Sequence, residues 1–287
     1  MKIITYPALM ATLVLAGCSE SPDDSKVEVA VTDAAEEVEA AVVAATEAEQ
    51  GLCLDAGPQT PRDISSKLGL NLDDFKMAPP ASEMNLCNIH THTNAEHKAS
   101  GFSVFVSDQD DGGYACNETS ELTAAELEAA PGAYQGVKPG DTIEVHWVHT
   151  TCDATPGPGL GACLPEGCEN PLFRVEAQAF LVVNDSQALD FNQMAYGGNR
   201  VDGRPQAKLI PTNTGDPVVF RGSTTGPSYD QQSCSALKVT WSVRPQCAKL
   251  DINSLHLWAE NGNAFEETKS HGVRQLVTAP ELLSPIK

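Results

Sequence analysis

The sequence predicts a mainly β, α+β domain built on a central, largely antiparallel and twisted sheet with few short helices. Runs of β-branched and aromatic residues recur between stretches rich in proline and glycine, which is the pattern of strands separated by turns. Patterns of helix-forming residues are confined to short segments. Eight cysteines are spread over the chain after residue 50, which is typical of an exported domain held by disulfides.

Six segments have the composition of strands. They are residues 86–93, 101–107, 141–149, 173–183, 217–221 and 236–244. We expect a short helix at residues 120–130, where a capping residue precedes helix formers and a Pro-Gly stop, and another at residues 62–68. Residues 153–171 are rich in proline and glycine and predict an irregular loop held by cysteines.

The N-terminus is typical of an exported lipoprotein. Residues 1–17 contain Lys2, an apolar run too short to span a membrane, and small residues directly before Cys18. We therefore expect a signal peptide that ends at residue 17 and a lipid on Cys18. Because Ser19 follows the lipidated cysteine, we expect an anchor in the outer membrane, with the domain in the cell envelope facing the periplasm or the cell surface.

Residues 18–50 form an acidic segment rich in alanine and glutamate, which we interpret as a tether. Residues 19–50 contain ten acidic residues, one lysine and no aromatic residue, so they have little with which to build a core. The net charge of the chain is −21, which argues against nucleic acid or an anionic membrane surface as a ligand. Residues 51–287 are long enough for one domain with its own core.

The cysteines of this domain predict up to four disulfides. They are Cys53, Cys87, Cys116, Cys152, Cys163, Cys168, Cys234 and Cys247. Their number leaves 105 possible pairings, among which a local loop between Cys163 and Cys168 is one candidate. The chain contains no C-x-x-C motif, which argues against a zinc site made of thiolates.

Three histidines have the spacing of a metal site. His90 and His92 are two residues apart in a predicted strand, so their side chains lie on the same face of it. His146 lies in a second predicted strand, within the motif IEVHWVH. Three imidazoles leave one position of a tetrahedral metal open, which is the arrangement of a catalytic zinc and not of a structural one.

The motifs HTHTNAEH, EVHWVH and RGSTTGPSY, followed by VTW, occur in this order between Cys87 and Val243. In them the chain resembles the δ-class carbonic anhydrases and, in the order of the motifs, the α class. The resemblance implies an α-carbonic-anhydrase-like fold with Zn²⁺, replaceable by Co²⁺, on His90, His92 and His146. It also implies the reversible hydration of carbon dioxide to bicarbonate and a proton by a zinc-bound hydroxide.

The same resemblance implies roles for residues around the metal. Glu144 would orient the imidazole of His146. Thr224 would be the gate hydroxyl, accepting a hydrogen bond from the hydroxide and donating one to Glu96. The substrate pocket would contain Val148, Thr225 and Trp241, with Val182 and Val183 as further candidates for its wall.

Some positions depart from these families. Thr91 stands between the first two histidines, where δ-class sequences have an aromatic residue. No histidine precedes His90, so the upstream proton shuttle of many α-class enzymes has no counterpart, and we expect buffer, water or a carboxylate to carry the proton. Ser223 precedes Thr224, where the α class has an apolar residue.

The other four histidines have simpler interpretations. His97 and His149 lie beside the motifs at odd spacing from the ligands, so we expect them to face away as hydrogen-bonded core residues. We expect His256 and His271 to be structural or exposed.

Two alternative functions fit parts of the sequence. The spacing His90-x-His92-x3-Glu96 resembles the first metal motif of cupin-type metalloenzymes, but Met84 stands where that motif has a glycine. The second alternative is a non-catalytic binding module of the cell envelope on the same fold. Such a relative usually lacks a ligand histidine, whereas all three are present here.

Overall fold

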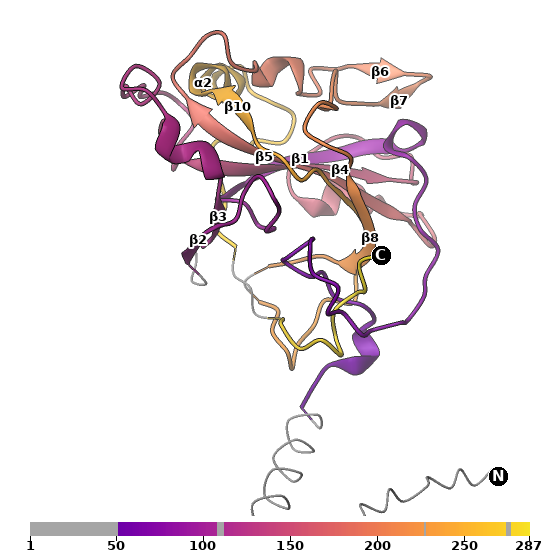
Figure 1. The fold of residues 1–287 in the computed structure, drawn as a ribbon. Helices are drawn as coiled ribbons and strands as arrows, with labels where there is room; N and C mark the ends of the chain where they lie inside the picture. The colour runs from indigo at the N-terminus through magenta and orange to yellow at the C-terminus, as the bar shows by residue number, and fades with distance from the viewer. Residues whose placement is uncertain (1–50, 108–111, 227, 274–276) are drawn as a thin grey trace, which may run out of the picture. The chain divides into compact units, whose positions relative to one another are not determined.

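A six-stranded sheet forms the centre of the part of the chain that the computed structural model describes, which is residues 51–287 except 108–111, 227 and 274–276 (Figure 1). The strand order is β1-β4-β5-β9-β8, and β10 also pairs with β5. The strands are β1 (Asn85–Thr93), β4 (Thr142–Thr150), β5 (Phe173–Val183), β8 (Val218–Ser223), β9 (Lys238–Val243) and β10 (Ala248–Asp251).

The sheet is largely antiparallel, as the sequence predicts. The pairs β1–β4, β4–β5 and β8–β9 are antiparallel, whereas β9 and β10 both run parallel to β5. β9 pairs with residues 173–177 of β5 and β10 with residues 180–183, so the two strands follow one another along a single edge of β5.

The remaining elements are short. Two small sheets consist of β2 (Val104–Ser107) with β3 (Gly113–Ala115) and of β6 (Arg200–Val201) with β7 (Arg204–Pro205). The 3-10 turns are η1 (Leu54–Ala56), η2 (Ala81–Glu83), η3 (Asn117–Glu121), η4 (Leu160–Cys163) and η5 (Phe191–Gln193). Among the described residues the one α-helix is α2 (Ile252–Glu260). The predicted fold class, mainly β with few short helices, is confirmed.

Both predicted helices are wrong. Thr123 and Glu126 form a reciprocal cap, but after η3 ends at Glu121 the chain makes only a turn in this range, since so short a helix is marginal without packing. Residues 62–68 contain no helix, because the Arg62 carbonyl and the Ile64 amide bond instead to the backbone of Lys98. The sequence pattern did not predict α2, although Asp251 accepts a hydrogen bond from the amide of Asn253 as a cap.

Both faces of the sheet are covered by other residues. All nine residues of β4 are therefore buried. On one face Val145 and Trp147 belong to a core that includes Phe180 and residues of α2, and α2 lies against this side of the sheet in Figure 1. On the other face Val148 packs in a second core with Trp241. Since side chains alternate along a strand, His146 lies on the face of Val148.

His149 lies on the opposite side of the strand, as predicted. It is fully buried, and its Nδ1 lies 3.0 Å from the carbonyl oxygen of Trp147. Burial lowers the pKa of His149 to about 4. His149 is therefore a neutral core residue at physiological pH.

All eight cysteines of the domain form disulfides. The pairs are Cys53–Cys234, Cys87–Cys163, Cys116–Cys247 and Cys152–Cys168. The local loop between Cys163 and Cys168 was a wrong prediction. Cys163 ends η4 beside β1 and therefore meets Cys87, and Cys168 meets the cysteine just after β4.

Residues 51–287 form one compact unit. The predicted signal peptide, the lipidation site Cys18 and the acidic tether lie outside the described residues and stay predictions. Within the described segments, none of the helices has the length and apolar character that crossing a membrane requires.

Candidate metal centre

Two neighbouring strands bring the three predicted ligands together. In the antiparallel pairing of β1 with β4, His90 lies opposite His146, and His92 lies opposite Glu144. One nitrogen from each of the three histidines lies within 4.8 Å of the others. The ring centroids are 4.5 to 5.1 Å apart. The three imidazoles therefore face a common point, as their spacing in the sequence predicts.

Each of the three rings has one nitrogen beside an acceptor. The Nδ1 atom of His90 lies 2.7 Å from Oδ1 of Asn88, and Nε2 of His146 lies 3.2 Å from Oε1 of Glu144. The Nδ1 atom of His92 lies 2.6 Å from Oε2 of Glu96, at ion-pair distance but without hydrogen-bond alignment. Such acceptors determine the tautomer of a metal-binding histidine, so the second nitrogen of each ring is left for an ion.

The protonation states also suit a metal. Burial, together with the neighbouring histidines, lowers the pKa of His90 well below its usual value and lowers the pKa of His92 as well. Burial alone would raise the pKa of Glu96, but the charge of Arg62 and contacts with His92 hold it well below its usual range. These shifts favour neutral imidazoles at His90 and His92 and an ionised carboxylate at Glu96, the forms in which these groups bind and orient a cation.

Glu144 is the most enclosed of these acceptors. Its side chain is fully buried, and its Oε2 accepts a hydrogen bond of 3.0 Å from the backbone amide of His97. Its Oε1 lies 2.7 Å from Nδ1 of His97 and also faces His146. The partners His97 and His146 lower the pKa of Glu144 despite its burial. Glu144 is thus placed to orient His146, as the resemblance implies.

His97 differs in part from its prediction. It is a buried, hydrogen-bonded residue as expected, but it lies on the ligand side and does not face away. The reason is that β1 ends at Thr93 and Asn94 adopts a positive φ of 61°, so the strand alternation does not continue to His97. His97, Glu144 and His146 form a second group of possible ligands that shares His146 with the first.

Glu96 and Thr224 have other partners than the resemblance implies. Glu96 forms a buried ion pair with Arg62 and faces His92 with its other oxygen. The hydroxyl of Thr224 bonds to that of Ser235. Among the described residues the expected hydrogen bond from Thr224 to Glu96 is therefore not formed. The amide of Thr224 donates to the carbonyl of Leu237, which places the threonine beside Ser235.

A largely apolar pocket of about 510 Å³, including its open mouth, lies over the three histidines. Its lining contains three of the predicted pocket residues, Val148, Thr225 and Trp241, together with Thr224. It also contains residues that were not predicted from the sequence: Leu160, Cys163, Leu164, Phe173, Val175, Leu237 and Val239.

Val182 and Val183 do not line this pocket, so their prediction is wrong. The half of β5 that pairs with β10 carries them, whereas the pocket uses Phe173 and Val175 at the other end of the strand. Val182 also points into the core on the opposite face of the sheet.

Two polar residues of the site were also missed. Asn88 precedes His90 by two residues on the same strand, so the strand period could have identified it. Arg62 lies 34 residues before Glu96, and no local pattern connects the two.

No curated protein matches the chain. One similar solved structure is the complex of alpha-carbonic anhydrase from Thermovibrio ammonificans with the inhibitor sulfanilamide, at 15% sequence identity. The match covers 74% of this chain and 82% of that chain, with a TM-score of 0.24. A hyperthermostable carbonic anhydrase identified from an active hydrothermal vent chimney is also 15% identical. That match covers 77% of this chain and 86% of the other, with a TM-score of 0.25. These TM-scores are too low to support an argument.

The family model provides the stronger result. The model of the delta carbonic anhydrases matches residues 81–254, which is more than half of the chain and includes His90, His92 and His146. The chain therefore belongs to the delta carbonic anhydrase family.

Proposed function

We propose that the protein is a zinc enzyme that interconverts carbon dioxide and bicarbonate at the site formed by His90, His92 and His146. One observation carries the proposal: the three imidazoles converge, and each has one ring nitrogen beside an acceptor. Three neutral nitrogen donors are a ligand set that zinc prefers, and cobalt is the expected substitute. Held by these three histidines, zinc would act as a Lewis acid and would make hydroxide available near neutral pH, as is established for carbonic anhydrases.

The residues of the chain have separate tasks in this proposal. Asn88, Glu96 and Glu144 orient the three imidazoles. The apolar walls, including Val148 and Trp241, accept carbon dioxide, which carries no charge, and exclude bulk water from the pocket. The hydroxyls of Thr224 and Thr225 face the same pocket and provide polar contacts for the bicarbonate product.

The alternatives have less support. A cupin-type site needs Glu96 as a ligand, but its carboxylate already contacts Arg62 and the Nδ1 atom of His92. A non-catalytic module has no need of three converging histidines under an apolar pocket. We also propose, from the sequence alone, that the enzyme is anchored through lipid on Cys18 in the outer membrane.

Stopped-flow hydration of carbon dioxide tests the activity. The purified chain loaded with zinc should catalyse hydration well above the buffer rate, and chelator-stripped protein should not until zinc is restored. Folded protein that holds zinc at the three histidines without catalysis would support the binding module. Binding of iron or manganese through Glu96 would support the cupin-type enzyme.

Replacing Thr224 by alanine should leave zinc in place and lower kcat/KM roughly a hundredfold, the effect of losing one preorganised hydrogen bond. Measurement of zinc content and hydration rate on the same sample checks this. Ser235→Ala is the matched control, because it removes the present partner of Thr224 but leaves the Thr224 hydroxyl in the pocket. Equal rates for Thr224→Ala and the wild type would exclude Thr224 from the reaction.

A further inference from the structure

A short segment before the family-matched region lies against the metal centre. We call residues 59–62 the N-terminal strap. The backbone of Gln59 bonds to the C-terminal segment, since its amide donates to the carbonyl of Leu282 and its carbonyl accepts from the amide of Ser284, both at 2.8 Å. At the other end, the carbonyl of Arg62 accepts from the amide of Lys98 at 2.7 Å. These contacts fix the position of the Arg62 backbone.

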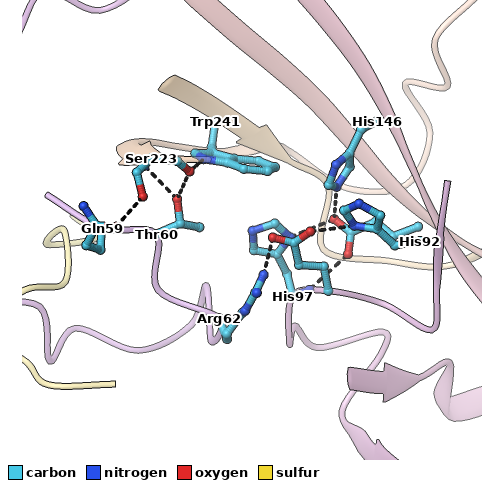
Figure 2. A network of polar contacts seen from close by, with 10 residues as sticks. Gln59, Thr60, Arg62, His92, His97, His146, Ser223 and Trp241 are labelled. Atoms are coloured by element: carbon cyan, nitrogen blue, oxygen red, sulfur yellow. Dashed lines mark hydrogen bonds and ion pairs between the residues drawn. The ribbon is translucent and has the colours of Figure 1, made fainter. Parts of the chain in front are cut away.

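Arg62 forms a buried ion pair at the end of this strap. Its side chain is 6% exposed, that of Glu96 is fully buried, and its Nη1 donates to Oε1 of Glu96. The other oxygen of Glu96 is the one that lies 2.6 Å from Nδ1 of His92. Figure 2 shows Arg62, His92 and His146 in one network of polar contacts. Arg62 thus contacts the metal centre through the carboxylate of Glu96.

The N-terminal strap also contacts the end of β8, directly before the pocket residue Thr224. The hydroxyl of Thr60 donates to the carbonyl of Ser223 at 2.7 Å and accepts from its amide at 3.0 Å (Figure 2). A side-chain carbon at Gly222 would lie 2.4 Å from the Thr60 hydroxyl, so glycine is needed for this close approach. Ser223 directly precedes Thr224, the threonine in the pocket. One segment therefore touches both the partner of a ligand and the strand end that carries the pocket hydroxyls.

A buried carboxylate beside an imidazole needs a second partner to keep its orientation. Without Arg62, the carboxylate of Glu96 could rotate away from His92 or form other contacts. The planar guanidinium has several donors in a rigid arrangement, so it restrains a carboxylate more closely than an ammonium group does. Groups of this kind behind a metal ligand typically change metal affinity 10- to 100-fold.

We propose that Arg62 is a positioning residue of the metal centre: it holds Glu96 so that Glu96 orients His92, and the N-terminal strap supplies it. The proposal rests on the three-histidine zinc site proposed above. It assigns part of that site to a segment outside the matched residues 81–254. A chain cut to the matched region would lack this contact.

The test measures zinc affinity in the full chain by competition with a chromophoric chelator. Arg62→Met should raise the dissociation constant of zinc 10- to 100-fold, and Arg62→Lys should restore part of the loss. The visible spectrum of the Co²⁺ form should change in Arg62→Met, because the environment of His92 changes. Arg174→Met is the matched control, since Arg174 pairs with Glu176 away from the ligands; it should leave affinity and spectrum unchanged.

A double-mutant cycle shows whether Arg62 acts through Glu96. In a Glu96→Gln background, Arg62→Met should add less than about a twofold change in zinc affinity, because the residues act in series. Independent, multiplying effects would overturn the proposal. So would a folded Arg62→Met with wild-type affinity and cobalt spectrum. If Arg62→Met does not fold, Arg62→Lys decides: wild-type affinity and spectrum would overturn the proposal, and a loss of affinity would support it.

These outcomes are separate from those for the proposed function. Wild-type protein that binds zinc at the three histidines but does not hydrate carbon dioxide would contradict the proposed activity. The affinity effect of Arg62 would still be measurable in that protein. Conversely, an active wild-type enzyme with no effect of Arg62 on zinc would contradict only the present proposal.

Discussion

His146→Ala should lose zinc and carbon dioxide hydration together. His146 is the proposed ligand on β4, and its side chain is 2% exposed between Glu144 and the other two histidines. With two ligands left and a cavity in place of the third, the site should hold zinc too weakly to survive purification. Zinc content by elemental analysis and stopped-flow hydration on the same sample measure both effects.

His271→Gln is the control for this variant. His271 is about half exposed and pairs with Glu267, so its replacement should leave zinc and activity in place. If His146→Ala kept both zinc and activity, another side chain would have to supply the third ligand. The group of His97 with Glu144 would then be the first place to look.

Removing the Cys87–Cys163 disulfide with a double serine variant should lower the free energy of unfolding by about 4 kcal/mol, because this bridge closes a long loop. The two cysteines are 76 residues apart in the sequence. The same change should lower hydration activity in the molecules that stay folded. Cys163 lies between Leu160 and Leu164 in the pocket lining, and the bridge ties this loop to β1 three residues before His90.

Urea unfolding and kcat/KM of the folded variant measure the two effects. The serine variant of Cys116 and Cys247 is a matched control, because that bridge spans 131 residues and neither cysteine lines the pocket. It should cost similar stability and leave kcat/KM unchanged. Equal kcat/KM in both folded variants would show that the loop does not shape the pocket.

Much of the site follows from the period of a strand. The two-residue spacing of His90 and His92 places both on one face, and the same rule connects Glu144, His146 and Val148. Asn88 obeys this rule too and could have been identified. The rule failed for His97, because β1 ends before it and the turn at Asn94 changes the direction of the chain.

The helix predictions failed for a different reason. Residues 120–130 have good helix formers and a reciprocal cap, yet local preference supports only a turn there. Residues 252–260 form α2, whose Ile252, Leu255 and Trp258 pack in the core beside the sheet. Tertiary packing, and not propensity alone, decides which short segment becomes a helix.

The sequence by itself determined the mainly β class, the three histidines and the family resemblance, because these depend on residue types at short, regular spacing. Only the tertiary structure decided the disulfide pairs, the partners of Thr224 and the ion pair of Arg62 with Glu96. Each of these joins residues that are distant in the sequence or set by the packing around them. The physical reason is that such contacts depend on how distant segments of the chain pack against the sheet, which no local pattern of side chains encodes.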